Sequence, residues 1–230
     1  MVCHSEGMME VHADMVKSEP EPLLRLVVCL GNPGDRYACT RHNAGWQAAE
    51  RLLQIGKWVL SEWQPLSGEL FQYSSETTEV YLLKPLTFMN DSGRAVKEVL
   101  EKLGISPPEI LLLCDCLDLP AGTLRLRKRG SSGGQKGLES IIQILGTTQI
   151  ARLRIGIGRP EPGTEDVVDY VLSSWVSAEQ KKMAEMFSVA AELAFTILEK
   201  GWEEAVSRLA IWTADKINAS KQGEPEIGKV

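Results

Sequence analysis

The chain has 230 residues, 43% of them apolar, which is enough to bury one substantial core, and it carries a formal net charge of −6. No stretch approaches the ~20 apolar residues of a membrane span. The N-terminal segment has neither the layout of a secretory signal nor the arginine-rich, acid-poor composition of a mitochondrial presequence. We therefore expect a cytoplasmic protein with no membrane partner, a mitochondrial location being less favoured.

The five cysteines are odd in number, and three of them (Cys29, Cys114 and Cys116) lie inside apolar runs, where reduced thiols behave as small hydrophobic groups. This usage indicates a reducing compartment. Cys114 and Cys116 resemble half of a zinc site, but no second Cys/His pair completes four ligands. We expect neither a metal nor a cofactor.

Charge is distributed unevenly along the chain. Residues 121–160 contain eight basic residues and one acidic residue, a local charge of +7, whereas residues 161–204 contain ten acidic and three basic residues. One face can therefore bind a polyanion although the whole chain is acidic.

The two ends lack a periodic apolar pattern. We expect a disordered N-terminal tail over residues 1–22, a single domain over residues 23–213, and a disordered C-terminal tail over residues 214–230.

The first half of the domain alternates strands and helices. A buried strand is predicted at 23–31, ending at the turn Asn32-Pro33-Gly34, followed by a helix from about residue 43 to 55 that Thr40 or Asn43 can cap. Two strands then pair across a polar loop, the second at 80–84. Ser92 is expected to cap the next helix, which Gly104 ends.

The second half continues this alternation. The segment "EILLLCDCLDLP" predicts a buried strand, and "GTLRLRKRG" predicts a strand with leucines inward and arginines outward. A short helix over "LESIIQILG" and a strand over "ARLRIGIG" follow. Ser177 and Gln180 form the capping box of a long helix that ends at Gly201, and a short helix follows it. The pattern predicts a single-domain α/β fold with a mixed, mostly parallel sheet and helices on both faces, the alternating strand being antiparallel.

Polar residues follow three of the predicted strands. Asn32, Asn90 and Asp115 lie at or near strand ends, and His42 begins the helix that returns from the Asn32 loop. Ligands of such sheets bind outside the carboxyl ends of the strands, so we expect these four residues to meet in one crevice.

This set contains the groups that a general-base reaction needs. His42 is the only histidine outside the N-terminal tail. A neutral imidazole accepts a proton from water near pH 7, Asp115 can orient it, and the positive end of the helix is expected to hold it neutral. Asparagine amides can donate to a developing oxyanion. The alternative is that His42 is a structural helix-start residue and the asparagines are turn residues.

A competing motif is "GSSGG" at residues 130–134, which matches the G-x-S-x-G pattern of a nucleophile elbow and makes Ser132 a candidate nucleophile. Such enzymes have their histidine late in the chain, whereas here none follows residue 42. The same glycines also suit a phosphate-binding turn or an ordinary connector.

Together, the segments "LGNPGDRYACTRHNAG", "LLKPLTFMNDSGRAV", "CDCLDLPAGTLRLRKRG", "GGQKGL" and "RLRIGIGRP" resemble the bacterial-type peptidyl-tRNA hydrolase family, in order and approximate spacing, over residues 25–200. The resemblance implies an enzyme that cleaves the ester between a peptide and the 3′ ribose of tRNA. It implies peptidyl-tRNA as the partner, presented free or on a ribosome or ribosomal subunit.

The resemblance also assigns roles to individual positions. His42 matches the catalytic base and Asp115 the carboxylate that steadies it. Asn32 matches the residue that recognises the peptide part, and Asn90 one that holds substrate and water. Further positions match substrate contacts: Tyr37 and Phe88 line the site of the tRNA end, and Arg127 and Arg154 are associated with tRNA phosphates.

One position departs from the family pattern. Where the family has His-Asn between "GG" and "GL", this chain has Gln135-Lys136. Gln135 can supply an amide from the neighbouring position, or Lys136 can contact the terminal phosphate. The change also leaves open a protein that binds tRNA or structured RNA with weak or no catalysis.

Overall fold

The computed structural model describes residues 23–74 and 79–222, without the side chains of residues 219–222. The predicted N-terminal tail and the last eight residues of the predicted C-terminal tail, 223–230, lie outside the described residues.

The described residues form one seven-stranded sheet in the order β2-β3-β4-β1-β5-β7-β6. Its strands are β1 (Leu26–Cys29), β2 (Val59–Leu60), β3 (Gly68–Ser74), β4 (Glu79–Pro85), β5 (Ile110–Cys116), β6 (Leu124–Arg127) and β7 (Ala151–Gly156). The four central strands β4, β1, β5 and β7 are parallel, and the pairs β2/β3, β3/β4 and β6/β7 are antiparallel. The carboxyl ends of the parallel strands therefore meet at one edge.

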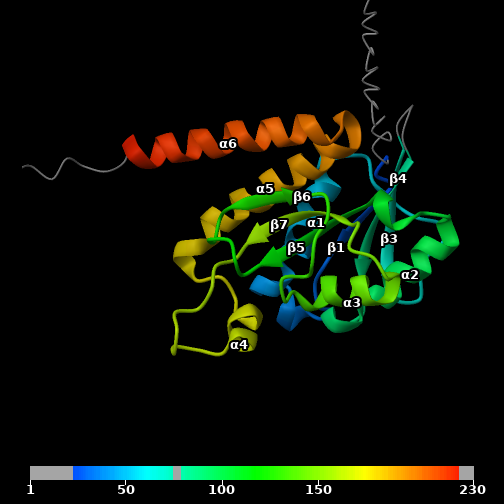
Figure 1. Ribbon diagram of the computed structural model, residues 1–230, viewed down its shortest axis with the longest axis horizontal. Coiled ribbons are helices and arrows are strands. Elements are labelled where there is room, and N and C mark those ends of the chain that lie inside the picture. The colour runs from blue at the N-terminus through cyan, green and yellow to red at the C-terminus, as the bar shows by residue number, and fades with distance from the viewer. Residues whose placement is uncertain (1–22, 75–78, 223–230) are drawn as a thin grey trace, which may run out of the picture.

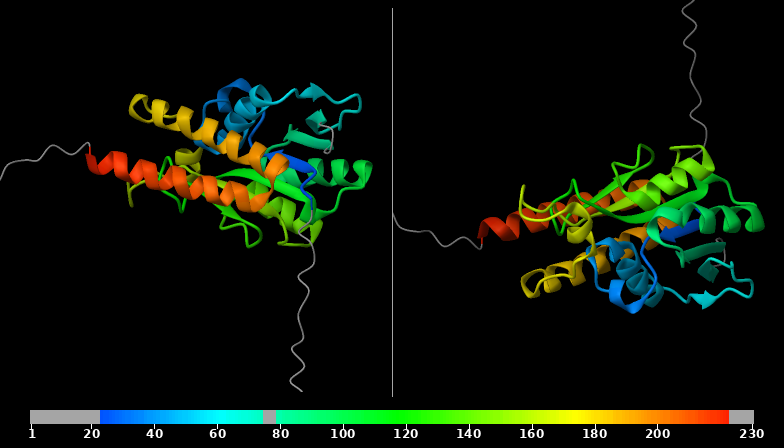
Figure 2. Two further views of the ribbon diagram at one scale, coloured as in Figure 1. Left: turned by 90° about the horizontal axis from the view of Figure 1, so that it is seen from above. Right: turned by 90° about the horizontal axis from the view of Figure 1, so that it is seen from below.

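Helices cover both faces of the sheet (Figure 1). The helices are α1 (Ala44–Ile55), α2 (Ser92–Leu103), α3 (Lys136–Leu145), α4 (Val167–Leu172), α5 (Ser177–Lys200) and α6 (Trp202–Gln222). Helices α1, α5 and α6 pack on one face of the sheet, and α2 and α3 pack on the other. Each face has its own buried apolar cluster. In Figure 2, α5 and α6 run next to each other over the first face.

The two faces follow from the strand sequences. In β5 all seven residues are buried, as expected for a strand covered on both sides. Its residues alternate between the clusters, with Leu111 and Leu113 in one and Leu112 and Cys114 in the other. The predicted mixed, mostly parallel α/β sheet is confirmed. So is the alternating antiparallel strand β6, whose arginines are exposed.

Several predicted caps are wrong. Neither Thr40 nor Asn43 caps α1 with its side chain. The Thr40 hydroxyl donates to the Tyr37 carbonyl at 2.8 Å, and the Asn43 amide bonds to the backbone of Asn32. The Ser92 hydroxyl donates to the Met89 carbonyl at 2.9 Å rather than accepting from its own helix. At the start of α5, Glu179 accepts from the backbone N–H of Val176 at 3.2 Å, in place of the predicted Ser177/Gln180 box.

The last helix is longer than predicted. Residues 214–222, assigned to the tail from sequence, continue α6. No glycine or proline interrupts the sequence between Trp202 and Gln222, so nothing ends the helix there. Helix α4 and the two-residue strand β2 were not predicted, since each is too short for a periodic pattern to show.

Candidate active site

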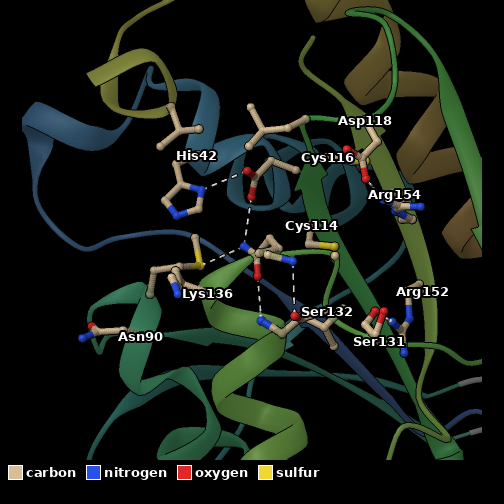
Figure 3. Close-up of a pocket in the computed structure, with 18 of the residues that line it drawn as sticks. His42, Asn90, Cys114, Cys116, Asp118, Ser131, Ser132, Lys136, Arg152 and Arg154 are labelled. Atoms are coloured by element: carbon tan, nitrogen blue, oxygen red, sulfur yellow. Dashed lines mark hydrogen bonds and ion pairs between the residues drawn. The ribbon is translucent and has the colours of Figure 1, made fainter. Parts of the chain in front are cut away.

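His42 and Asp115 form a hydrogen-bonded pair at the carboxyl edge of the sheet. The ring Nδ1 of His42 lies 2.9 Å from Oδ2 of Asp115, whose side chain is only 3% exposed (Figure 3). An ionised carboxylate only accepts, so Nδ1 carries the proton and Nε2 remains free to accept one. This is the tautomer that a general base requires.

The pair forms because α1 begins against the strand ends. His42 lies in the 3₁₀ turn Arg41–Asn43 directly before α1. A Cβ on Gly45 would lie 2.5 Å from the carbonyl oxygens of Leu30 and Leu113, so glycine allows the helix to start in contact with β1 and β5. The backbone N–H of Trp46 then donates to the Leu30 carbonyl at 3.2 Å.

Asn32 is held by three hydrogen bonds. The buried Asn43 amide accepts from the N–H of Asn32 at 2.9 Å and donates to its carbonyl at 3.0 Å. The side-chain Oδ1 of Asn32 accepts from the N–H of Met89 at 2.8 Å. Oδ1 is therefore occupied, and Nδ2, which has no partner among the described residues, is the free donor of the Asn32 amide.

These residues line a cavity of about 640 Å³. Its wall also includes Phe88, Asn90, Arg127, Lys136 and Arg154, so the structure brings together all the predicted site residues except Tyr37. Tyr37 lies beside the cavity, where its ring meets that of Phe88 edge to face at a centroid distance of 6.4 Å. Asn90 and Phe88 are exposed at the rim.

The basic part of the rim comes from β6 and β7. Arg127 is exposed on β6, and Arg154 on β7 donates to Asp118 at 3.3 Å. Asp118 also accepts from Arg159 at 2.6 Å, and these guanidinium groups hold the pKa of the Asp118 carboxyl below its ordinary value. Lys136, exposed at the start of α3, pairs with Glu139 at 3.0 Å.

Buried Arg152 supports the glycine-rich loop on this side of the cavity. Its side chain donates four hydrogen bonds to the carbonyls of Ser131, Thr148 and Ile150, so a charge that is 2% exposed is compensated by backbone acceptors. In Figure 3 Arg152 lies beside Ser131.

Ser132 lacks the partners of a nucleophile. Its hydroxyl accepts from the N–H of Gly134 at 3.3 Å, and no histidine bonds to it among the described residues. The positive φ angles of the loop fall on Gly130, Gly133 and Gly134 rather than on Ser132. The segment is therefore a glycine turn leading into α3 and not a nucleophile elbow.

The pKa of His42 is raised above its ordinary value of 6.5. Burial of the ring lowers it, but the charge of Asp115 and the hydrogen bond to it raise it by more. The net direction is opposite to the one expected from the helix start, because the Asp115 carboxylate lies 2.9 Å from the ring.

Sequence reasoning missed the role of Asn43 and left that of Gln135 open. The sequence predicts only a cap at Asn43, and no sequence signal shows that its amide reaches Asn32. The Gln135 amide lies against Asp115 at 3.0 Å. Within residues 23–74 and 79–222, no cluster of three or more His, Cys, Asp or Glu side chains is arranged to hold a metal.

The fold and the site together define a single-domain α/β enzyme of the hydrolase class. The sequence profile of the family described as peptidyl-tRNA hydrolase matches residues 26–219. Curated relatives named peptidyl-tRNA hydrolase include that of Symbiobacterium thermophilum, 44% identical over 81% of this chain and 98% of its own, and that of Aquifex aeolicus, 41% identical over 80% and 94%. The crystal structure of peptidyl-tRNA hydrolase from Acinetobacter baumannii superposes with a TM-score of 0.75 at 33% identity, covering 84% of this chain and 97% of that one.

This chain belongs to the peptidyl-tRNA hydrolase family. In the part of the chain that the structure describes, no helix combines the length and apolar character needed to cross a membrane.

Proposed function

We propose that this protein hydrolyses the ester between an N-blocked aminoacyl or peptidyl group and the 3′ ribose of tRNA, with His42 as general base. The observation that carries the assignment is the 2.9 Å contact between His42 and buried Asp115 in a cavity with a basic rim. Family membership supplies the substrate class.

The reaction needs one water molecule and no protein nucleophile. His42 Nε2 takes a proton from water as the oxygen attacks the ester carbonyl, and Asp115 stabilises the imidazolium that forms. The tetrahedral intermediate then expels the ribose 3′ oxygen, which takes the proton from His42. The products are a free peptide acid and a tRNA with its 3′ hydroxyl restored.

Asparagine amides bind the acyl part. The free Nδ2 of Asn32 is available to a peptide carbonyl, since Oδ1 is fixed by the N–H of Met89. A blocked substrate offers an amide carbonyl, whereas an unblocked aminoacyl group offers an ammonium that no donor satisfies. Asn90, at the rim, is assigned to holding substrate and water.

The basic rim binds the tRNA backbone. Arg127 and Arg154 lie on neighbouring strands beside the cavity, and Lys136 extends the positive charge to the start of α3. Tyr37 and Phe88 form an aromatic edge on which the terminal base can stack.

A discharge assay tests this proposal. Wild type is incubated with N-acetylated and with unblocked aminoacyl-tRNA, and free tRNA is measured. We expect rapid cleavage of the blocked substrate alone. Cleavage of neither, with retained tRNA binding, would instead support the RNA-binding alternative that Lys136 raises. Labelling of Ser132 by a fluorophosphonate would support a serine hydrolase.

We infer that the protein acts in the cytoplasm on peptidyl-tRNA released from ribosomes or still held by a ribosomal subunit. Cys29 and Cys114 are buried free thiols, which suits a reducing compartment. Cosedimentation with ribosomes loaded with peptidyl-tRNA tests the second part: recovery in the supernatant alone would limit the substrate to free peptidyl-tRNA.

A further inference from the structure

Asp115 has a second partner besides His42. While its Oδ2 faces the imidazole, its Oδ1 accepts from Nε2 of Gln135 at 3.0 Å. Both oxygens of a carboxylate that is 3% exposed are therefore occupied, one by the candidate base and one by a neutral amide.

The orientation of the Gln135 amide is fixed by its own surroundings. Gln135 is the N-cap residue of α3, and its Oε1 accepts from the N–H of Leu138 at 2.6 Å. A backbone N–H only donates, so Oε1 must face it and Nε2 must face Asp115. Nε2 also lies 3.2 Å from Sδ of Met89, a weak acceptor.

The start of α3 is itself held in place by close packing. A Cβ on Gly137 would lie 2.5 Å from Sδ of Met89 and 2.8 Å from Cδ1 of Leu30. A Cβ on Gly93 of α2 would lie 2.5 Å from the Ser140 carbonyl oxygen. Two glycines thus let α3 lie against α2 and against Met89 and Leu30, and the cap side chain has little freedom to move away from Asp115.

We propose that Gln135 is a positioning residue: its amide fixes the plane of the Asp115 carboxylate and so the ring of His42, an inference that rests on the proposed function. Without the second donor the carboxylate can rotate about its bond to Cβ, and the direction of its hydrogen bond to His42 is lost. Gln135 thus joins the start of α3 to the base. It touches no reacting atom.

The simpler interpretation is that Gln135 only caps α3, and two variants separate the roles. Asparagine is among the best N-cap residues but is one methylene too short to bond to Leu138 and Asp115 together, so Gln135→Asn keeps the cap and loses the positioning contact. Gln135→Glu keeps length and cap but places an acceptor against Oδ1 of Asp115. Gln143→Asn, at an exposed site of the same helix, is the matched control.

Each variant has its own expected result. For Gln135→Asn we expect kcat on N-acetylated aminoacyl-tRNA to fall roughly tenfold with KM and Tm near wild type, the size expected for one hydrogen bond to a charged group. For Gln135→Glu we expect the pKa of His42 to rise. A second carboxylate then faces Asp115, and the added negative charge near the ring favours the protonated imidazole. Asp118, Arg127, Arg129, Lys136, Arg152 and Arg154 also line the cavity and are unchanged in every variant.

The His42 pKa is read by NMR titration of the imidazole protons, assigned by their loss in His42→Ala. This readout needs no turnover, so a wild type without esterase activity would refute the proposed function and still leave the positioning role measurable. The inference is overturned if Gln135→Asn keeps kcat within twofold of Gln143→Asn, or if Gln135→Glu leaves the His42 pKa unchanged.

Discussion

At the scale of single residues, His42 depends on the carboxylate beside it. Burial alone would lower the pKa of the ring, and Asp115 more than reverses this. A base must be neutral to act, so kcat/KM should decrease as the pH drops below the raised pKa of His42. This decrease should begin at a higher pH than it would for an ordinary imidazole.

Asp115→Asn should move this acid limb to lower pH, because burial then acts on the ring without an opposing charge. It should also reduce kcat by about 10² or more, since the amide can donate to Nδ1 and stabilise the wrong tautomer. The pH dependence of kcat/KM measures both effects. An acid limb that stays in place would mean that the limb does not report His42.

The same contact links stability to pH. The pKa of His42 is raised on folding, so the contribution of the pair to stability is complete below the ordinary pKa of 6.5 and is lost as pH rises through the folded-state value. The free energy of unfolding of wild type relative to Asp115→Asn should therefore decline across this window. A stability difference between the two proteins that increases with pH would contradict a raised His42 pKa in the folded state.

Asn43 fixes Asn32 from a fully buried position. Asn43→Ala removes two hydrogen bonds and leaves the N–H and carbonyl of Asn32 unpaired, so we expect a loss of about 2–4 kcal/mol in urea unfolding together with a raised KM. Asn218→Ala, at an exposed site of α6, provides the control. Equal stability of the two variants would contradict the stabilising role of the hydrogen bonds between Asn43 and Asn32.

At the scale of elements, the site depends on two helix starts that glycines bring close to their neighbours. Because Gly45 has no Cβ, α1 can pack closely against the ends of β1 and β5. In the same way, Gly137 lets α3 pack closely against Met89 and Leu30. Periodicity predicted both helices. It could not predict the contacts at their first turns, because these depend on which strands lie beside each helix.

Gly137→Ala tests this packing. Helix propensity alone would make alanine stabilising by up to about 1 kcal/mol, whereas the collision with Met89 should make it destabilising by about 1–3 kcal/mol. Urea unfolding against Gln143→Ala, an exposed substitution in the same helix, decides the sign. A more stable Gly137→Ala would show that α3 has room to shift.

The caps show where local sequence misleads. Ser92, Asn43 and Ser177 are all residue types that favour helix starts, yet their hydrogen bonds or their positions differ from the expected caps. A short polar side chain bonds to whichever backbone group the fold brings near it. For Asn43 that group belongs to Asn32, eleven residues earlier and on the other side of a turn.

At the scale of the molecule, basic and acidic residues are separated. Along the chain, the strands β6 and β7 carry the arginines beside the cavity, whereas residues 161–204 contain ten acidic and three basic residues. This separation was visible in the sequence as a change of sign near residue 160. The convergence of His42, Asp115 and Asn32 followed from strand ends meeting at one edge, but strand order itself was visible only in the structure.

tRNA binding should weaken with salt because phosphates release counterions when arginines neutralise them. Arg127→Gln and Arg154→Gln should each reduce the slope of log K against log [salt] by about 0.7–0.9 if each contacts one phosphate. Arg208→Gln, on α6 and paired with Glu204, should leave the slope unchanged. A wild-type affinity that does not change with salt concentration would contradict the binding of tRNA phosphates by these arginines.

The central claim is that His42 activates water against an ester of tRNA. The most direct measurement compares wild type and His42→Ala on N-acetylated aminoacyl-tRNA, with tRNA binding measured in parallel. We expect cleavage to fall by about 10²–10⁴ while binding stays within about twofold, since the substitution removes the base and leaves the basic rim intact. Equal cleavage by the two proteins would contradict the account.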